Sequence, residues 1–324
     1  MTADLFHISS PTTFNRICLE TFEFQYEHIA VYRKYCDLIQ KSPAHVNSYL
    51  EIPFLPIEFF KTHELIAQGK TQEVIFSSSG TTGSTTSKHL VASKKLYEES
   101  FFRAFKQFYG AVEDRVILAL LPSYLEREGS SLIYMVDALI KESKRKESGF
   151  FLHNHQELYD TLSSLKQAGE KPILFGVTFG LLDFIEQHPI AYPDLTVIET
   201  GGMKGRRKEM IREEVHEILS TGFQVQKIHS EYGMTELLSQ GYSKGDGIFY
   251  APEWMKILIR DPNDPFTLLE SGKSGAINVI DLANIYSCSF IATQDLGIQY
   301  PDTSFKVLGR FDNSDIRGCN LLVQ

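Results

Sequence analysis

The sequence of 324 residues lacks several features that define specialised classes of protein. Its net charge is -9, from 32 basic and 41 acidic residues, so no overall positive field attracts nucleic acid or an anionic membrane. The longest apolar stretch, residues 172–185, is too short and too interrupted to span a bilayer. The first residues contain no cationic segment followed by an apolar run, so no secretory signal is predicted and a cytoplasmic location is expected.

Sites that depend on cysteine or histidine clusters are also poorly represented. The sequence has four scattered cysteines: Cys18, Cys36, Cys288 and Cys319. No Cys-x-x-Cys pair indicates zinc or a redox couple, so free thiols are expected. The segment His153-Asn-His155 has no carboxylate or further cysteine at ligand spacing, which argues against a metal there. No Gly-x-Ser-x-Gly element supports a hydrolase.

What the sequence does contain is a globular α/β pattern, with 43% hydrophobic and 23% charged residues. Buried-strand candidates alternate with amphipathic helices, which predicts mainly parallel sheets covered by helices. The expected strands are 74–76, 116–121, 150–153, 172–177, 195–199 and 224–229, and the expected helices are 94–109, 130–141, 156–167 and 206–219. After residue 248, short β segments with turn signals predict a smaller antiparallel part.

Three regions are expected along the chain. Residues 1–247 form the α/β core with a helical N-terminal segment, and residues 51–61 are extended because two prolines break any helix there. Residues 248–313 form the smaller β subdomain, and residues 314–324 form a tail that carries Cys319.

A segment rich in serine, threonine and glycine, residues 77–88, is the strongest local signal for chemistry. Its glycines allow backbone N–H groups to converge on an oxyanion, its hydroxyls add donors, and Lys88 supplies positive charge, a composition that suits a polyphosphate. It is not a Walker P-loop, because Ser87 precedes the lysine where that motif requires glycine. Taken alone, the segment is also compatible with a flexible linker.

A second segment, Ser230-Glu-Tyr-Gly-Met-Thr-Glu236, places a glycine turn, a hydroxyl and a carboxylate after an expected strand. Together, Ser-Ser-Gly-Thr-Thr-Gly and Tyr-Gly-x-Thr-Glu resemble the phosphate loop and the Mg-ATP motif of the adenylate-forming enzymes. These enzymes include acyl-CoA synthetases, firefly luciferase and peptide-synthetase adenylation domains. The resemblance implies ATP and Mg as cofactors and a carboxylic acid as substrate.

Three further segments follow in the order that the resemblance implies. Thr293-Gln-Asp295 resembles a Thr-Gly-Asp segment whose aspartate binds ribose, although Gln294 replaces the glycine. Gly309-Arg310-Phe-Asp312 resembles the Gly-Arg-x-Asp segment at the hinge to a lid domain, and Thr200-Gly201-Gly202 resembles a turn along the adenine.

The resemblance thereby assigns a role to particular residues. Nucleotide binding is implied for Ser78, Ser79, Gly80, Thr81, Thr82, Gly83, Gly201, Gly202, Glu231, Tyr232, Gly233, Asp295 and Arg310. Catalysis is implied for Lys88, Thr235 and Glu236, with Glu236 also as the Mg ligand. These assignments suit the reaction, because attack of a carboxylate on the α-phosphorus depends on positioning and charge stabilisation.

Most of the chain is similar to the acyl-protein synthetases of the LuxE type. Residues 52–61 resemble their Pro-containing signature and residues 315–320 their C-terminal tail, and no lid domain is expected. In that family a cysteine near the C-terminus accepts the acyl group and passes it to an acyl-CoA-reductase-type partner of the LuxC type or to a carrier, and Cys319 stands at the matching position. The resemblance implies a fatty acid as the substrate. The alternative for Cys319 is a residue that packs the tail onto the core.

Three functions therefore remain open from the sequence. The first is acyl-protein synthesis from ATP and a carboxylic acid. The second is an acyl-CoA or aryl-CoA ligase whose lid is supplied by another chain. The third is a non-catalytic module that binds adenylate or acyl groups.

Overall fold

In the computed structural model, residues 5–78, 86–122, 129–201 and 210–310 are described. The chain forms two compact units by its internal contacts. Unit 1 comprises residues 1–97, 235–239 and 250–324, and unit 2 comprises residues 98–234 and 240–249. The α/β class with a parallel and an antiparallel part is confirmed. The first 97 residues belong to the same unit as the C-terminal strands, whereas the sequence pattern predicts a boundary between the α/β core and a β subdomain at residue 248.

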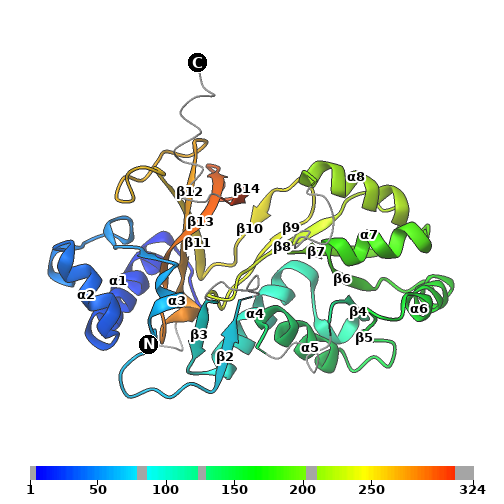
Figure 1. The fold of residues 1–324 in the computed structure, drawn as a ribbon, viewed down its shortest axis with the longest axis horizontal. Helices are drawn as coiled ribbons and strands as arrows, with labels where there is room; N and C mark the ends of the chain where they lie inside the picture. Colours follow the sequence, from blue (N-terminus) through cyan, green and yellow to red (C-terminus); the bar gives the residue numbers. More distant parts are fainter. Residues whose placement is uncertain (1–4, 79–85, 123–128, 202–209, 311–324) are drawn as a thin grey trace. The chain divides into compact units, whose positions relative to one another are not determined.

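Unit 2 is built on a mainly parallel sheet (Figure 1). Its strands, in spatial order, are β5 (Gly149–Phe150), β4 (Ile117–Leu120), β6 (Ile173–Val177), β7 (Thr196–Thr200), β8 (His229–Tyr232) and β9 (Gly241–Ser243). All pairs are parallel except β8 with β9. Its helices are α4 (Lys94–Tyr109), α5 (Ser131–Ser143), α6 (His155–Gln167), α7 (Thr178–Gln187) and α8 (Arg212–Phe223), and η4 (Val112–Asp114) precedes β4.

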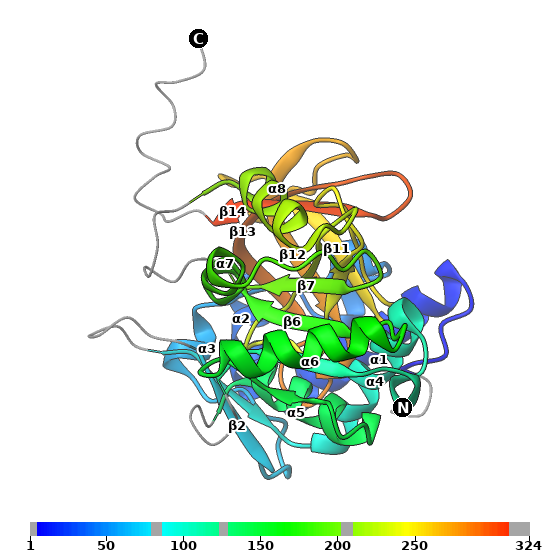
Figure 2. The same cartoon turned by 90° about the vertical axis from the view of Figure 1, so that its right-hand side faces the viewer.

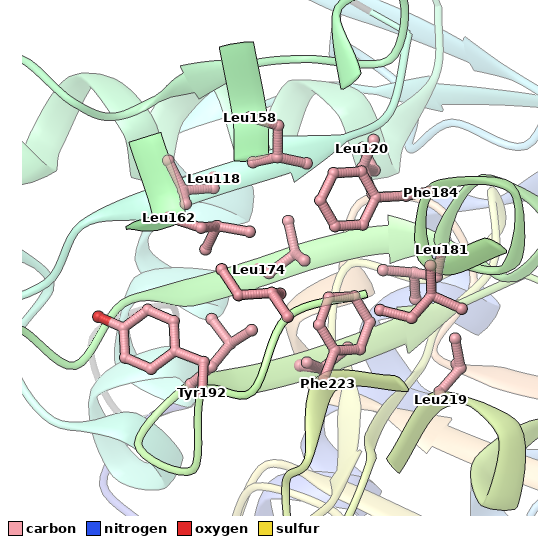
Figure 3. Packing of buried hydrophobic residues seen from close by; sticks show 14 of the residues in the cluster. Leu118, Leu120, Leu158, Leu162, Leu174, Leu181, Phe184, Tyr192, Leu219 and Phe223 are labelled. Carbon is pink, nitrogen blue, oxygen red and sulfur yellow. The ribbon is translucent and has the colours of Figure 1, made fainter. Parts of the chain in front are cut away.

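Helices α6, α7 and α8 cover one face of this sheet (Figure 2). Leucines of β4 and β6 meet leucines and phenylalanines of the three helices in one cluster, shown in Figure 3. Leu118, Leu174, Leu162 and Phe184 are fully buried there. Fully burying one such side chain stabilises the fold by about 1.5–3 kcal/mol, so this cluster fixes the strand ends that lead into the candidate site.

Unit 1 contains an antiparallel sheet and a separate hairpin. The sheet has β11 (Met255–Arg260), β12 (Ser274–Asp281), β13 (Phe290–Gln299) and β14 (Phe305–Arg310), with β1 (Leu55–Pro56) parallel to β13. The hairpin pairs β2 (Val74–Ser77) with β3 (Lys88–Val91), and β10 (Phe249–Tyr250) lies where the chain passes between the units. Its helical elements are α1 (Pro11–His28), α2 (Ala30–Leu38), η2 (Pro43–His45), η3 (Tyr49–Glu51), α3 (Phe59–Thr62) and η5 (Leu282–Asn284).

The N-terminal helices belong to unit 1 because their aromatic side chains pack on β13. Phe22 and Tyr32 both contact the ring of Phe290, at centroid distances of 6.4 and 6.3 Å. None of the helices within the described residues combines the length and hydropathy that a membrane span requires.

Several expected boundaries differ from the structure. The strand predicted at 224–229 is wrong: Gln224 ends α8 in the left-handed region with φ 52°, and the strand begins only at His229. Residues 51–61 are extended only as far as Pro56, after which α3 begins at Phe59. The apolar run 172–185 contains a strand and a helix, β6 and α7, and β3 was not predicted.

Candidate functional site

The Ser/Thr/Gly segment connects the two strands of the β2–β3 hairpin in unit 1. Its ends are joined by two hydrogen bonds: the Ser78 amide donates to the Ser87 carbonyl at 3.1 Å, and the Ser87 amide donates to Ser78 Oγ at 2.9 Å. Lys88 follows at the start of β3 with an exposed side chain. Residues 79–85, which include the predicted Ser79, Gly80, Thr81, Thr82 and Gly83, lie outside the described residues.

The carboxyl group of Glu236 is buried next to the end of this hairpin loop. Its side chain is 5% exposed, and burial raises its pKa above the ordinary value. A hydrogen bond from the Ser87 side chain and the positive charges of Arg310 and Lys61 act in the opposite direction. The predicted phosphate segment and the predicted Mg ligand therefore meet within unit 1, beside two cationic side chains.

Strands β13 and β14 bring a second predicted pair together. Asp295 and Arg310 are cross-strand partners, and Arg310 Nε donates to Asp295 Oδ1 at 3.4 Å. The Asp295 carboxylate is largely buried, whereas the Arg310 side chain is 66% exposed. Arg310 is thus paired with Asp295 and still accessible to a ligand.

The segment that carries Asp295 is held from both sides. Arg260 is buried, donates to the Thr293 carbonyl at 2.7 Å, and has its pKa lowered to about 10 by that burial. Gln294, which stands where the family has glycine, donates to Glu58 Oε1 at 2.6 Å. The side chain of Gln294 therefore joins this segment to the start of α3.

In unit 2, the ends of β7 and β8 carry the remaining predicted residues. Thr200 Oγ1 donates to Glu231 Oε2 at 2.7 Å, and Tyr232 is buried against the ring of Phe249. Gly201 follows β7 with φ 79°, a left-handed conformation that favours glycine. Gly202 lies outside the described residues.

Gly233 lies close to the carboxylate of Glu231. A Cβ atom at this position would collide with Glu231 Oε1. A side chain at residue 233 would therefore require the end of the Glu231 side chain to shift.

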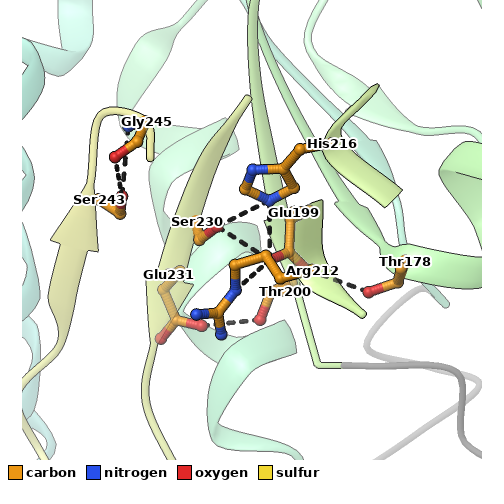
Figure 4. A network of polar contacts seen from close by, with 9 residues as sticks. All are labelled: Thr178, Glu199, Thr200, Arg212, His216, Ser230, Glu231, Ser243 and Gly245. Atoms are coloured by element: carbon orange, nitrogen blue, oxygen red, sulfur yellow. Dashed lines mark hydrogen bonds and ion pairs between the residues drawn. The ribbon is translucent and has the colours of Figure 1, made fainter. Parts of the chain in front are cut away.

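A buried polar network centred on Glu199 supports this end of the sheet (Figure 4). Ser230 Oγ donates to Glu199 Oε1 at 2.9 Å, and Thr178 Oγ1 donates to Oε2 at 3.0 Å. His216 and Arg212 approach the same carboxylate at 3.5 and 3.9 Å. Burial acts to raise the pKa of Glu199, but these hydrogen bonds and charges outweigh it and lower the pKa.

The same network contains the residue types of a hydrolase triad but not its geometry. Ser230 is completely buried and donates its proton to Glu199 rather than to His216, whose Nε2 lies 3.3 Å from Ser230 Oγ. A nucleophilic serine requires a base that accepts its proton and a path to substrate. Glu199 therefore anchors β7 to β8 and is not part of a catalytic relay.

Replacing Glu199 by Gln is expected to destabilise the protein by about 1–3 kcal/mol at pH 7, because a charged acceptor of several hydrogen bonds is lost. Since the pKa of Glu199 is lowered in the folded state, its contribution is present above its unfolded pKa and is lost as the pH falls through the folded one. Urea unfolding of both proteins over a descending pH series measures this effect. A difference that stays constant across the series would contradict the charge-based account.

The chain is matched by the family model described as acyl-protein synthetase, LuxE, over residues 5–324. The chain belongs to this acyl-protein synthetase family. No curated protein sequence matches it.

Solved structures with a similar fold include MatB and a CoA ligase. ATP-bound MatB from Rhodopseudomonas palustris matches with TM-score 0.56 and 17% identity, covering 76% of this chain and 49% of MatB. The open conformation of 2-hydroxyisobutyryl-CoA ligase, in complex with 2-HIB-AMP and CoA, matches with TM-score 0.67 and 12% identity, covering 94% and 75%. The postadenylation state of the same ligase with R3-HIB-AMP gives TM-score 0.70 and 11% identity, covering 94% and 68%. The chain thus spans about half the length of the first of these structures.

The predicted site residues that the structure describes fall into two groups. Ser78, Lys88, Thr235, Glu236, Asp295 and Arg310 belong to unit 1, and Gly201, Glu231, Tyr232 and Gly233 belong to unit 2. The Tyr-Gly-x-Thr-Glu motif crosses from one unit to the other between Met234 and Thr235. The nucleotide-binding roles of these residues stay predictions, as does the role of Cys319, which lies outside the described residues together with Asp312.

One cation near Glu236 was missed by the sequence analysis. Lys61, at the end of the Pro-containing segment 52–61, is exposed and acts electrostatically on the Glu236 carboxyl group. The sequence did carry one signal for Lys61: it is the last residue of the segment that resembles the family's Pro-containing signature.

Proposed function

We propose that this chain uses ATP to convert a carboxylic acid, most simply a fatty acid, into an acyl-adenylate and then transfers the acyl group to the thiol of Cys319. The observation that carries the proposal is the meeting of Ser87 with the buried Glu236 carboxyl group, beside the charges of Arg310 and Lys61. Membership of the acyl-protein synthetase family and the ligase fold support the same reaction class.

The arrangement in unit 1 suits binding of a triphosphate. The hairpin loop would supply hydroxyl and backbone N–H donors to phosphate oxygens, with Lys88 and Lys61 as cations. Asp295 would accept hydrogen bonds from the ribose hydroxyls, and Arg310 would contact the nucleotide from the neighbouring strand. The nucleotide-binding roles of the unit 2 residues remain as the sequence predicts them.

Glu236 fits the role of a Mg ligand. Its buried carboxyl group accepts a hydrogen bond from Ser87 and lies near the charges of Arg310 and Lys61, and no group of three potential metal ligands occurs among the described residues. Mg²⁺ is commonly held by one or two carboxylates together with substrate phosphates, which this arrangement satisfies. When bound, the ion would neutralise charge on the phosphate oxygens.

The reaction has two chemical steps, and the first needs no covalent bond to the protein. A carboxylate oxygen of the acid attacks the α-phosphorus of ATP, the bond to the β-phosphate bridge breaks, and pyrophosphate leaves. The Cys319 thiolate then attacks the carbonyl carbon of the acyl-adenylate, AMP leaves, and a thioester forms. Delivery of this acyl group to a partner of the acyl-CoA-reductase type, or to a carrier, is the expected use of the thioester.

The direct test is to incubate the protein with ATP, Mg²⁺ and a mixture of carboxylic acids, followed by intact-protein mass spectrometry. We expect the protein to gain the mass of one acyl group, which hydroxylamine removes. In a parallel assay with labelled pyrophosphate, we expect acid-dependent exchange of the label into ATP. The added mass identifies the acid. Binding of ATP with no exchange for any acid in a broad panel would favour the non-catalytic binding module.

Coenzyme A is the second candidate for the acyl acceptor. The observation in its favour is that 2-hydroxyisobutyryl-CoA ligase, of similar fold, was crystallised with 2-HIB-AMP and CoA in the thioesterification state. Consumption of coenzyme A by this chain, alone or with another chain that supplies a lid, would support a CoA ligase. An acyl label on the protein without coenzyme A would support the acyl-protein synthetase.

A further inference from the structure

Residues Thr235–Ser239 of unit 1, which include Glu236, are held by three buried polar side chains that no motif of the sequence identified. His89 of β3, Asp281 at the end of β12 and Asn284 of η5 are each at most 1% exposed. We call these three residues the buried frame. All of them, and the segment they hold, belong to unit 1.

The first half of the segment is held through its backbone carbonyls. His89 Nδ1 lies 2.8 Å from the carbonyl oxygen of Thr235, and Asn284 Nδ2 donates to that of Glu236 at 2.7 Å. The two side chains also meet each other, with His89 Nε2 2.9 Å from Asn284 Oδ1. Two consecutive carbonyls, on both sides of the Glu236 Cα atom, are thus contacted by one connected pair of side chains.

The second half is held by a carboxylate. Asp281 Oδ2 accepts from the amides of Leu238 and Ser239 at 2.7 and 3.0 Å, and Oδ1 accepts from Ser239 Oγ at 2.6 Å. Trp254, the one tryptophan of the sequence, donates from Nε1 to Ser239 Oγ at 3.0 Å. The backbone that carries Glu236 is therefore fixed before and after the residue.

The contacts of His89 cannot all be satisfied by a neutral ring. The chain of contacts from the Thr235 carbonyl through His89 and Asn284 to the Glu236 carbonyl has an acceptor at each end. A neutral imidazole has one N–H, so in either tautomer, and with either orientation of the amide, at least one of the three contacts sets an acceptor against an acceptor. A doubly protonated ring would satisfy all three, but burial lowers the pKa of His89 to about 4.

Burial makes the charged forms of His89 and Asp281 unfavourable. Burial raises the pKa of Asp281 to about 6 despite the hydrogen bonds it accepts. An apolar residue at position 281 would nevertheless leave the buried amides of Leu238 and Ser239 without this acceptor, and each unsatisfied amide would destabilise the fold. Three buried polar side chains thus contact one segment of five residues, Thr235–Ser239, and hold its backbone.

We propose that His89 and Asn284, together with Asp281, are positioning residues that fix the backbone on both sides of Glu236 so that its carboxylate is correctly placed toward the phosphates of ATP. This inference rests on the proposed function. None of the three side chains needs to touch the substrate. Displacement of a catalytic group by about 1 Å can lower a rate by about 10²-fold, which sets the size of the expected effect.

The test replaces His89 by Leu and by Asn, and Asn284 by Asp. Leucine packs beside the ring of Phe60, which lies 5.5 Å from the His89 ring, so H89L is expected to fold, with a melting temperature lowered by the loss of the contacts to Thr235 and Asn284. Its rate of ATP–pyrophosphate exchange is expected to fall about 10–100-fold. In H89N the amide nitrogen can occupy the place of Nδ1 and still donate to Thr235, so part of the rate should return. The ionised side chain of N284D cannot donate to the Glu236 carbonyl, so above the pKa of that carboxyl group this variant should be as slow as H89L.

A matched control is available three residues from Asn284. The hydroxyl of Ser287 is buried and has no hydrogen-bond partner among the described residues, so S287A is expected to match the wild type in both rate and stability. A folded H89L or N284D protein with wild-type exchange would overturn the proposal. So would an equal loss in H89L and H89N.

Trp254 offers a readout that does not depend on catalysis. Because its Nε1 donates to Ser239, its fluorescence should report the environment of the segment, and MgATP should change it in the wild type. H89L and N284D are expected to require at least about tenfold more MgATP for the same change, and S287A is not. If the wild type shows no ATP–pyrophosphate exchange with any acid, the proposed function fails. The MgATP titration would still decide whether the frame positions the segment. Equal MgATP titrations in all four proteins would refute the frame alone.

Discussion

Replacement of Glu236 by Gln is expected to reduce acid-dependent ATP–pyrophosphate exchange by at least about 10²–10³-fold while the protein remains folded. Glutamine has nearly the same shape, and its amide oxygen can still accept the hydrogen bond from Ser87. What the variant loses is the negative charge that would hold Mg²⁺ against the triphosphate. The effect should be seen in the rate at saturating acid and in the Mg²⁺ concentration needed for half-maximal exchange.

The same substitution should increase stability near neutral pH. Burial raises the pKa of Glu236, so the folded state binds its proton more tightly than the unfolded state does. The free energy of unfolding of the wild type therefore falls as the pH rises from the unfolded pKa of this group through its folded pKa. Glutamine cannot ionise, so E236Q should lack this fall and be more stable than the wild type above both values.

The measurements are exchange at several Mg²⁺ concentrations and urea unfolding over a rising pH series. Glu270, 87% exposed in a surface ion pair with Lys273, provides the control: E270Q should change neither quantity. A folded E236Q protein that exchanges at the wild-type rate would remove Glu236 from the mechanism. A loss of stability at neutral pH would instead show that the charge of Glu236 supports the fold.

Local periodicity was sufficient to predict some elements closely. The helix expected at 94–109 is α4, with the same bounds, because Leu96, Phe101 and Phe105 recur on one buried face. The boundary between β6 and α7 could not be read in the same way. Both elements are buried almost throughout, so the run 172–185 has no polar face to reveal a period. The parallel sheet itself was predicted because strands and helices alternate along the chain.

The candidate site was predictable only where its residues form short motifs. Asp295 and Arg310 were identified from two such motifs, and the structure pairs them across neighbouring strands. The buried frame could not be found, because its contacts join residues far apart in the chain: His89 is separated from Thr235 by 146 positions and from Asn284 by 195. A single histidine within an apolar segment of a sequence is also more often a packed core residue than a functional one.

Replacement of Cys319 by Ser is expected to abolish the hydroxylamine-labile acyl label, which is the second large effect. The other three cysteines are poor candidates for the acceptor, because each is buried and burial raises its thiol pKa, to about 12 for Cys36 and Cys288. The thiolate is the nucleophilic form, so these thiols are almost entirely unreactive near neutral pH. Cys319 lies nine residues after Arg310, a separation that spans at most about 30 Å, and such a reach suffices for transfer from a nucleotide bound near Arg310.

The variant separates the two chemical steps, because adenylate formation does not involve a thiol. C319S should retain acid-dependent ATP–pyrophosphate exchange at the wild-type rate and lose the added acyl mass in intact-protein spectra. C36A serves as the matched control and should keep both exchange and label. Persistence of the label in C319S would place the acyl group on another residue, and loss of exchange together with the label would mean that residue 319 contributes to adenylation itself. Retained exchange with no label would leave the acyl-adenylate as the product that awaits a thiol, and restoration of turnover by added coenzyme A would then measure how readily a second thiol can replace that of Cys319.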